Sequence, residues 1–544
     1  MRCCAASSTS ARANHPLATQ ADSPAAALDN AEDSGNGNWL NSLGGVLLIF
    51  AVYAALHIIL RVAASPNLSQ DDVMAVLYSQ TLELGYTPRQ PPLYDWMLWT
   101  VQQVTGPTLI SFLALKYTLL IASAGFIYSA ARRIFGSPLW ATLSALSLLL
   151  LYQIGWNIHE GVTHTSVMIC TIAATFWAFT RIAESQSLGN YLILGLAIGL
   201  GALTKYGYAA FLITLVAAAL LQPASRQLLQ NTRILAAAAL AIAITAPFAA
   251  WLFLNQHDLG TVYAGTVTYG EGGHWARAMR GVFLTFRSML TFLSPLILVV
   301  PLVFPGALNA AGHAFANVFK SEAGLDWEKL LLHMTLISLG LLLGAALLTG
   351  ASNLRMRYMH PFFLLTPLWL IAMARRGMTK PVQTRIFVVI SLVFALAVVV
   401  MRTGYLYVGE PPFCVKCRQM IPYDALAEAI RDRGFRSGTI IAGYRHTAGN
   451  MRQRFPEARV VALRRPHVVP TIRPDDREGQ IALVWDVGTE GAELPGGARE
   501  QVESLGGRIE RAPETIRIPW THTWRDTGYR HTDWNLIVID LTPK

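Results

Sequence analysis

The chain has 544 residues, of which 53% are hydrophobic and only 14% are charged. Soluble globular chains carry about 25% charged residues, so this composition excludes a wholly soluble enzyme. The formal net charge is +10. Lys and Arg mostly stand between long apolar runs and form no single basic block, which argues against nucleic-acid binding. The composition therefore predicts a membrane protein whose basic residues anchor its loops.

The N-terminal residues 1–38 are rich in Ala, Ser, Asn and Asp and contain no apolar run. The first strongly apolar stretch begins near Leu43, too far into the chain for a standard secretory signal. We expect residues 1–38 to form a disordered cytoplasmic tail.

Long apolar segments follow, and about 20 such residues span a bilayer as a helix. Eleven candidates stand at Leu43–Val62, Leu109–Ala131, Pro138–Gly155, Val162–Thr180, Tyr191–Leu203, Tyr208–Leu221, Ile234–Leu254, Val282–Phe304, Leu330–Leu348, Met359–Ala374 and Ile386–Met401. The fifth and sixth are short and are separated by Lys205, Tyr206 and Gly207, which favours a helical hairpin with its tip inside the protein. The sequence thus predicts a mainly α, polytopic membrane domain over residues 39–401.

The orientation follows from the excess of Lys and Arg in cytoplasmic loops. Basic residues such as Arg132, Arg181, Arg226 and Arg375 fall in alternate loops, which we therefore place in the cytoplasm. The loops 64–108, 156–161, 255–280 and 351–358 and the Lys205 tip then lie on the far side. Because the number of spans is odd, residues after Met401 lie there too.

Beyond Met401 the charge density rises and the apolar runs shorten. Strands are predicted at Thr439–Gly443, Arg459–Leu463, Gln480–Val487 and Trp534–Leu541, and helices at Asp424–Arg433, Thr447–Phe455 and Ala498–Leu505. Residues 402–544 are therefore expected to form a soluble, periplasmic α/β domain.

The first far-side loop, 64–108, is far longer than a plain connection requires. Val73–Leu84 and Leu93–Val104 have the amphipathic spacing of two helices that lie along the membrane surface. Asp71 and Asp72 stand at the start of the first helix. Taken alone, they are an N-cap and a solvated first-turn acid. Opposite several cations at the mouth of a membrane cavity, they become candidate catalytic carboxylates.

Four cations fall on the same predicted side, namely Arg89, Lys205, Arg355 and Arg357. A Lys between two apolar half-spans is costly unless an anion balances it, although it could also snorkel to the interface. Positive flanking residues belong on the cytoplasmic side, so Arg355 and Arg357 call for another explanation. Arg geometry suits a phosphate or a carboxylate. These residues predict a polar substrate that carries phosphate.

Two further far-side positions are ambiguous. Glu160 is either a second acid of the site or a loop charge paired with an Arg, and His257, beside Asp258, is either a ligand or part of a polar turn. The His residues do not form an i, i+4 cluster with Glu, so no metal site is predicted. No cofactor is firmly implied, and a divalent metal stays an open alternative.

Cys414 and Cys417 form the sequence CVKC just after the last span. In a cytosolic enzyme this spacing would suggest redox chemistry or zinc. On the far side of the membrane, an oxidising compartment favours a disulfide between them. Cys170 lies within a span and is expected in the core.

Four stretches in this order carry a family resemblance: QDDVMAVLYSQ from Gln70, QPPLYDWML from Gln90, LGALTKYGYAAF from Leu200 and RMRYMHPFFLLTP from Arg355. With them, the chain resembles the integral-membrane C-type glycosyltransferases that use polyprenyl-phosphate sugars. It looks most similar to the branch of lipid A aminoarabinose transferases and lipid A or core galacturonosyltransferases. The segment that follows Pro422 also looks like the periplasmic tail of the galacturonosyltransferase-like members.

The resemblance implies roles for single residues. Asp71 or Asp72 becomes the catalytic carboxylate, while Lys205 and the segment Arg355–Arg357–Tyr358 become candidates for holding the lipid phosphate. Glu160 stands where many members have a second loop acid. Aminoarabinose transferases carry a Lys before the Pro-Pro pair, but this chain has Gln90 there, so a cationic contact to the donor phosphate is missing or is supplied by Arg89. This departure favours the galacturonosyltransferase-like branch.

The expected reaction is an inverting transfer of a sugar from a polyprenyl-phosphate donor to lipid A, lipopolysaccharide core or another envelope glycolipid. The resemblance places it in the bacterial inner membrane, among membrane lipids, with the active site facing the periplasm. Cations would stabilise the leaving phosphate, and a carboxylate would act as general base on an acceptor hydroxyl. The rival interpretation is a transporter or flippase of a lipid-linked saccharide, whose mark would be two related halves with interrupted helices in matching places. Only one interrupted hairpin is visible.

Overall fold

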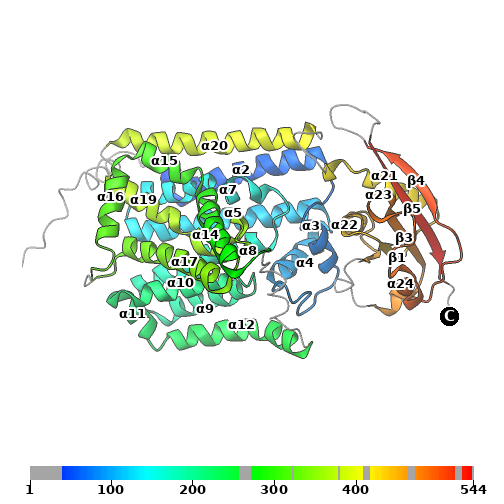
Figure 1. Ribbon diagram of the computed structural model, residues 1–544, viewed down its shortest axis with the longest axis horizontal. Helices are drawn as coiled ribbons and strands as arrows, with labels where there is room; N and C mark the ends of the chain where they lie inside the picture. The colour runs from blue at the N-terminus through cyan, green and yellow to red at the C-terminus, as the bar shows by residue number, and fades with distance from the viewer. Residues whose placement is uncertain are drawn as a thin grey trace, which may run out of the picture.

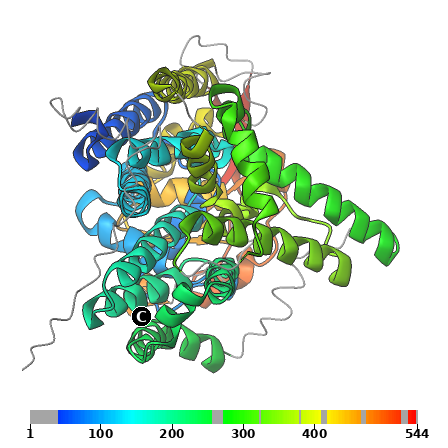
Figure 2. The same cartoon turned by 90° about the vertical axis from the view of Figure 1, so that its left-hand side faces the viewer.

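The computed structural model describes residues 39–255, 271–320, 324–377, 380–408, 417–463, 472–520 and 530–541. Long helices run side by side through most of the molecule, and a sheet with its own helices lies at one end (Figure 1). Figure 2 views the helices from the opposite end, with this sheet lying behind them. Two parts of different composition therefore follow one another along the long axis.

Six helices in the described part are long and apolar enough to cross a membrane. They are α2 (Leu43–Ala64), α5 (Leu109–Phe135), α8 (His164–Glu184), α12 (Ile234–Leu254), α17 (Trp327–Thr349) and α20 (Pro381–Val408). Their ends carry ordinary helix signals: the Ser42 hydroxyl accepts a hydrogen bond from the Gly45 amide at the start of α2, and α5 ends at Gly136 with a φ of 72°. The chain is a multi-pass membrane protein.

The other predicted spans are shorter or broken. Two bent helix pairs bring the number of candidate spans to at most eight in the described residues. The pairs are α10 (Tyr208–Leu220) with α11 (Pro223–Gln230), and α15 (Leu296–Val303) with α16 (Gly306–Ala316). The remaining helices of this region are α6 (Pro138–Leu146), α7 (Tyr152–Gly155), α9 (Leu188–Ala202), α14 (His274–Leu293), α18 (His360–Phe363) and α19 (Thr366–Gly377), with short 3-10 turns η2 (Trp39–Asn41), η3 (Ser147–Leu150), η4 (Asn157–His159) and η5 (Met356–Tyr358).

The prediction of eleven spans therefore differs from the observed helix lengths. The predicted segment Val282–Phe304, for example, is divided between α14 and α15 at Pro295. A proline has no amide hydrogen and clashes with the preceding turn, so an apolar run that contains one need not be one helix. Hydropathy counts apolar residues and does not detect such breaks.

The first long loop contains two helices, α3 (Asp72–Tyr78) and α4 (Leu93–Thr105). The helix predicted at Leu93–Val104 is confirmed as α4. The helix predicted at Val73–Leu84 is longer than the observed α3, which ends at Tyr78. The helix ends early because Gln80 pairs with the C-terminal part instead: its side-chain amide donates to the Val460 carbonyl at 3.0 Å, and the Val460 amide donates back at 2.8 Å. Tertiary contacts therefore override the helical periodicity here.

The turn between α9 and α10 lies against this first loop. The Leu93 amide donates to the Leu203 carbonyl at 3.0 Å, and the Tyr206 hydroxyl donates to the Pro88 carbonyl at 2.7 Å. These bonds fix the segment that carries Lys205 beside the start of α4. The predicted interruption between two short apolar helices is confirmed.

The C-terminal part contains a five-stranded sheet in the order β2-β1-β3-β5-β4. Its strands are β1 (Gly438–Ala442), β2 (Arg459–Ala462), β3 (Gln480–Asp486), β4 (Glu514–Pro519) and β5 (His531–Asp540). Strands β2, β1 and β3 are parallel, whereas β5 runs antiparallel to both β3 and β4. The helices around it are α21 (Tyr423–Asp432), α22 (Arg445–Arg454), α23 (Val487–Glu490) and α24 (Ala498–Ser504), with 3-10 turns η6 (Arg418–Met420) and η8 (Pro474–Arg477).

The two faces of the sheet belong to different cores. Ile440 and Ala442 of β1 pack in the same hydrophobic core as the membrane helices, while Ile441 between them packs in a separate core with Ala498 and Val502 of α24. Successive side chains of a strand point to opposite faces. One face of the sheet is therefore continuous with the rest of the molecule.

The connection between the two parts is made by α22 and α3. A Cβ at Gly449 would lie 2.7 Å from the Val73 Cα, so the two helices approach as closely as a glycine permits. Next to it, the Asn450 side chain accepts from the Leu68 amide at 2.9 Å and donates to the Leu68 carbonyl at 3.1 Å. The C-terminal part thus rests directly on the segment that leads into Asp71 and Asp72, on the same side of the membrane helices.

Candidate functional site

A cavity of about 820 Å³ lies where the first loop, the Glu160 loop, the Lys205 turn and the segment before α18 meet. Eight of the residues singled out in the sequence line it: Asp71, Arg89, Gln90, Glu160, Lys205, Arg355, Arg357 and Tyr358. They come from four segments that are far apart in the chain. Folding gathers them because polar groups within a membrane protein are stable only beside one another or in a hydrated cavity.

Asp71 is the N-cap residue of α3, as the sequence predicted, but its side chain forms no cap hydrogen bond. It lines the cavity. Burial by the surrounding protein raises the pKa of Asp71 above its usual value, while Lys205, Arg357 and Arg445 act in the opposite direction. An ionised carboxylate can accept a proton from a hydroxyl.

Lys205 stands at the turn between α9 and α10. Its ammonium donates to the Thr165 hydroxyl at 3.1 Å. Burial lowers the pKa of Lys205, and Asp71 partly opposes this shift. Lys205 and Asp71 line the same cavity, where their opposite charges attract each other.

The segment before α18 contributes the remaining cations. Arg355 and Arg357 are both exposed to the cavity. The Arg355 guanidinium donates to the Asn353 side chain at 2.8 Å, and that of Arg357 donates to the Tyr358 hydroxyl at 2.9 Å. Neither forms an ion pair with an acid in the part of the chain that the structure describes, so both charges are available to the cavity.

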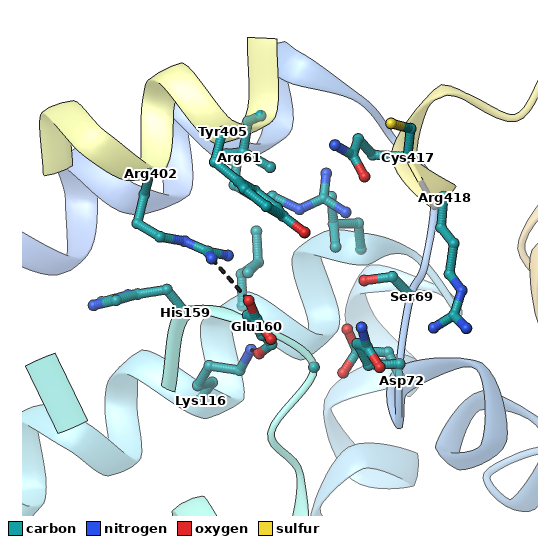
Figure 3. Close-up of a pocket in the computed structure, with 16 residues that line it drawn as sticks. Arg61, Ser69, Asp72, Lys116, His159, Glu160, Arg402, Tyr405, Cys417 and Arg418 are labelled. Carbon is teal, nitrogen blue, oxygen red and sulfur yellow. Dashed lines mark hydrogen bonds and ion pairs between the residues drawn. The ribbon is translucent and has the colours of Figure 1, made fainter. Parts of the chain in front are cut away.

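Glu160 satisfies both of the interpretations that the sequence left open. It lines the cavity, and its carboxylate also forms an ion pair with Arg402 of α20 at 2.9 Å (Figure 3). The ammonium of Lys116, from the first part of α5, donates to the Glu160 main-chain carbonyl. With Glu160 balanced by Arg402, the cations Arg89, Lys205, Arg355 and Arg357 outnumber the remaining acid, Asp71.

Asp72 faces a different space from Asp71. It lines a second cavity of about 310 Å³, shown in Figure 3, together with Lys116, Arg402 and others. Burial raises the pKa of Asp72 to about 6, with Lys116 acting in the opposite direction. The two consecutive acids therefore serve two cavities, as their separation of about 100° around a helix predicts.

Sequence reasoning missed Lys116 and Arg402. Both lie in long apolar helices, where an ionisable residue is itself a signal of function. The predicted last span ended at Met401, but α20 continues to Val408 and carries Arg402 with it. The contact between Glu160 and Arg402 joins residues 242 positions apart, and no local pattern indicates it.

The predictions for three residues, His257, Cys414 and Cys417, are only partly covered by the described residues. His257 and Cys414 lie outside the described residues. Cys417 is disulfide-bonded and buried, while the predicted pairing with Cys414 stays a prediction. Cys170 is a free, buried thiol in α8, as expected.

Gly161 holds the two acidic segments together. A Cβ there would lie 2.6 Å from the Gln70 Cβ, 2.7 Å from the Ser69 carbonyl oxygen and 3.0 Å from the Asp71 amide nitrogen. Gln70 itself has a φ of 54°, in the left-handed region that few residues other than glycine adopt. A strained residue beside a candidate catalytic acid is typical of active sites.

Comparison with known proteins identifies the family of the chain. The family described as dolichyl-phosphate-mannose-protein mannosyltransferase matches residues 89–251, which include Glu160 and Lys205. The lipopolysaccharide core galacturonosyltransferase RgtA of Rhizobium johnstonii is 30% identical over 441 residues, 80% of this chain and 86% of the relative. RgtB of the same organism, also a lipopolysaccharide core galacturonosyltransferase, is 26% identical over 89% of this chain and 96% of its own.

A third relative and a solved structure agree with these. The lipid A galacturonosyltransferase RgtD of Rhizobium johnstonii is 26% identical over 47% of this chain and 52% of its own length. The crystal structure of ArnT from Cupriavidus metallidurans bound to undecaprenyl phosphate has a TM-score of 0.54 and 14% identity, and it covers 91% of this chain and 98% of that one. This likeness shows a shared fold. On the identity to RgtA and the length that it covers, the chain belongs to the family of the lipopolysaccharide core galacturonosyltransferases, which are glycosyltransferases.

Proposed function

We propose that this protein transfers a galacturonosyl residue from a polyprenyl-phosphate carrier to a lipid A or lipopolysaccharide core acceptor on the periplasmic face of the bacterial inner membrane. The relatives named above support the sugar and the acceptor. The fold shared with an ArnT that was solved bound to undecaprenyl phosphate supports the lipid-linked donor.

The observation that carries the proposal is the single cavity that gathers Asp71 with Arg89, Lys205, Arg355 and Arg357. A donor phosphodiester carries one negative charge, and the phosphate monoester that leaves gains more, since its second pKa is about 6. Preorganised cations stabilise this developing charge without reorganisation of solvent. An excess of cations over acids suits such a leaving group.

Asp71 is the proposed general base. It accepts the proton of the acceptor hydroxyl as the oxygen attacks the anomeric carbon, and the bond from that carbon to the phosphate oxygen breaks. Attack from the side opposite the phosphate inverts the configuration. Lys205 and Arg357, whose charges both act on Asp71, are the cations placed to hold the phosphate.

The sugar has a separate space beside Asp71. A side pocket of about 160 Å³ is lined by Asp71, Tyr78, Arg89, Gln90 and His164 among others. Arg89 belongs to this pocket and to the large cavity. We assign it to the carboxylate of the uronic acid, because a guanidinium binds a carboxylate in bidentate fashion.

The test is the mass spectrum of the lipopolysaccharide from a strain that lacks this gene. We expect the deletion to remove one hexuronic acid increment from the core or lipid A. Wild-type protein should restore it and Asp71→Asn should not, at equal protein level in the membrane. A spectrum that is the same with and without the gene would refute the proposal, and loss of a neutral hexose or a pentose would refute the assigned sugar.

A further inference from the structure

The second cavity has no part in the reaction as described so far. Its walls are the end of α2, the start of α3, the first turns of α5, the Glu160 loop, the end of α20 and residues 417–419 of the C-terminal part (Figure 3). Its volume of about 310 Å³ is many times what a single water molecule needs. The cavity therefore has room for a chemical group of a ligand.

The charges on its walls favour an anion. Four cations, Arg61, Lys116, Arg402 and Arg418, line it together with two acids, Asp72 and Glu160. Since Arg402 is paired with Glu160, three cations surround one further acid. Two of them differ in burial: Lys116 is 1% exposed, whereas Arg418 is only partly buried. Such a surplus matches an oxyacid group, whose oxygens accept several charge-assisted hydrogen bonds.

Buried polar atoms point to the same conclusion. Asp72 Oδ1, Arg402 Nε and Gln419 Nε2 are buried and have no hydrogen-bond partner within the part of the chain that the structure describes. All three residues line this cavity. Buried polar groups nearly always have partners. Three unpartnered atoms on three walls of one cavity indicate a polar ligand that supplies the missing bonds.

The position of the cavity suggests which substrate it serves. Gln70, Glu160 and Gly161 line both this cavity and the large one that holds Asp71. The two spaces therefore share a wall at these three residues, and Gly161 adds no side chain to it. A substrate anchored in the second cavity can present a hydroxyl to Asp71 while the donor occupies the first.

We propose that the second cavity binds an anionic oxyacid group, a phosphate or a carboxylate, of the glycolipid acceptor, with Arg61, Lys116 and Arg418 as its cationic contacts. The proposal rests on the proposed function, since it assumes a glycolipid acceptor. Arg61 is held in place for this role, because its guanidinium donates to the Ser65 and Asn67 main-chain carbonyls. Arg418 brings the C-terminal part into acceptor recognition.

The test separates the Michaelis constants of the two substrates in the purified, full-length enzyme. We expect Arg418→Gln to raise the KM for the glycolipid acceptor about 10- to 100-fold, as loss of a hydrogen bond to a charged group predicts. The KM for the lipid-linked donor should stay the same, and Arg418→Lys should restore part of the loss. Arg357→Gln, in the first cavity, should show the opposite pattern. Arg499→Gln, at an exposed position of α24 away from both cavities, is the matched control and should change neither constant.

Two treated acceptors identify the anion. In one, the phosphates are removed with hydrofluoric acid, and in the other, the carboxylates are converted to methyl esters. With the wild-type enzyme, one treatment should raise the acceptor KM as much as Arg418→Gln does, and with Arg418→Gln that treatment should have little further effect. If neither treatment changes the wild-type KM, the cavity does not recognise an anion and the proposal is overturned.

The outcomes also separate this proposal from the proposed function. A wild-type enzyme that transfers nothing from a lipid-linked donor overturns both. A wild-type enzyme that transfers normally, while Arg418→Gln leaves the acceptor KM unchanged, overturns only the role of the second cavity.

Discussion

Asp71 and Asp72 are consecutive residues with different surroundings. Asp71 shares its cavity with Lys205 and Arg357, whereas Asp72 is 4% exposed and lies beside Lys116. Because one turns toward the proposed donor phosphate and the other away from it, the structure separates two acids that are equivalent in the sequence. Their substitutions should therefore differ.

Asp71→Asn keeps the shape of the side chain but removes its basicity. A general base contributes about 10²- to 10⁴-fold to the rate, so we expect kcat to fall by about this factor while the protein still accumulates in the membrane. Asp72→Asn should lower kcat far less and act mainly on the acceptor KM. Steady-state kinetics of the two purified variants decide the matter. Equal losses of kcat in both variants would contradict the separate roles.

The pH dependence should report the same base. Asp71 must be ionised to accept a proton, and burial raises its pKa above the usual 3.8. As the pH falls, kcat/KM should therefore decline at a higher pH than an ordinary Asp would dictate. Asp72, with a pKa of about 6, titrates nearby, so the profile is measured in Asp72→Asn as well. If the decline at low pH disappears in Asp72→Asn, the titrating group is Asp72, and the role of Asp71 as the base is contradicted.

At the scale of elements, the site depends on how closely the Glu160 loop approaches the start of α3. Gly161 is the point of contact. Neither residue pattern nor hydropathy predicts this, because the contact is made between loops distant in sequence. It does explain how Asp71 and Glu160 reach one cavity.

Gly161→Ala should disturb this arrangement. Its Cβ would overlap main-chain atoms of Ser69, which cannot give way as a flexible side chain can, so we expect about 1–3 kcal/mol of destabilisation. Displacement of Asp71 by about 1 Å would lower kcat by about 10². Gly340→Ala in α17, where a Cβ would meet no atom within 4 Å, is the control. Thermal unfolding and kcat should change in the first variant only, and unchanged kcat in Gly161→Ala would show that the close packing is dispensable.

Elements with strong local patterns were predictable. The alternating or buried apolar runs of β1, β2, β3 and β5 gave their positions within a few residues, and the amphipathic spacing of α4 did the same. The strand β4 was missed because Glu514, Arg517 and Pro519 give an edge strand the composition of a loop. Broken spans were missed because apolar content does not reveal a bend.

The site was predictable to the extent that charges in a membrane protein are conspicuous. Lys205 and Arg357 stood out because each interrupts or flanks an apolar run on an unexpected side. Lys116 was overlooked because one Lys inside a long apolar helix leaves the hydropathy of that helix nearly unchanged. Its role depends on Glu160 and Asp72, which only the folded chain brings near it.

At the scale of the whole molecule, the candidate site lies at one end of the helix bundle. Helices α3 and α4 of the first loop lie beside the C-terminal sheet there (Figure 1), and residues of the first loop line both cavities. The C-terminal part contributes Arg418 and Gln419 to the second cavity from the turn η6. The proposed periplasmic reaction therefore requires that the C-terminal part lies in the periplasm.

A topology reporter tests that orientation. A fusion after Leu541 should be active in the periplasm, because the C-terminal part contacts the loop that carries Asp71. A fusion at Gly377, at the end of α19 beside Arg375 and Arg376, should report a cytoplasmic position. Alkaline phosphatase and a cytoplasm-specific fluorescent protein provide the two readouts. A cytoplasmic signal from the fusion after Leu541 would place the site on the wrong side of the membrane for this mechanism.

The central claim is an inverting transfer from a lipid-linked uronic acid at Asp71. Its most direct test is the reaction of the purified enzyme with a polyprenyl-phosphate galacturonate and the glycolipid of the deletion strain, followed by nuclear magnetic resonance of the product. The account predicts one added galacturonosyl residue with inverted anomeric configuration, formed from the lipid-linked donor but not from a nucleotide sugar, and lost in Asp71→Asn. Retained configuration, transfer from the nucleotide sugar, or a fully active Asp71→Asn would contradict it.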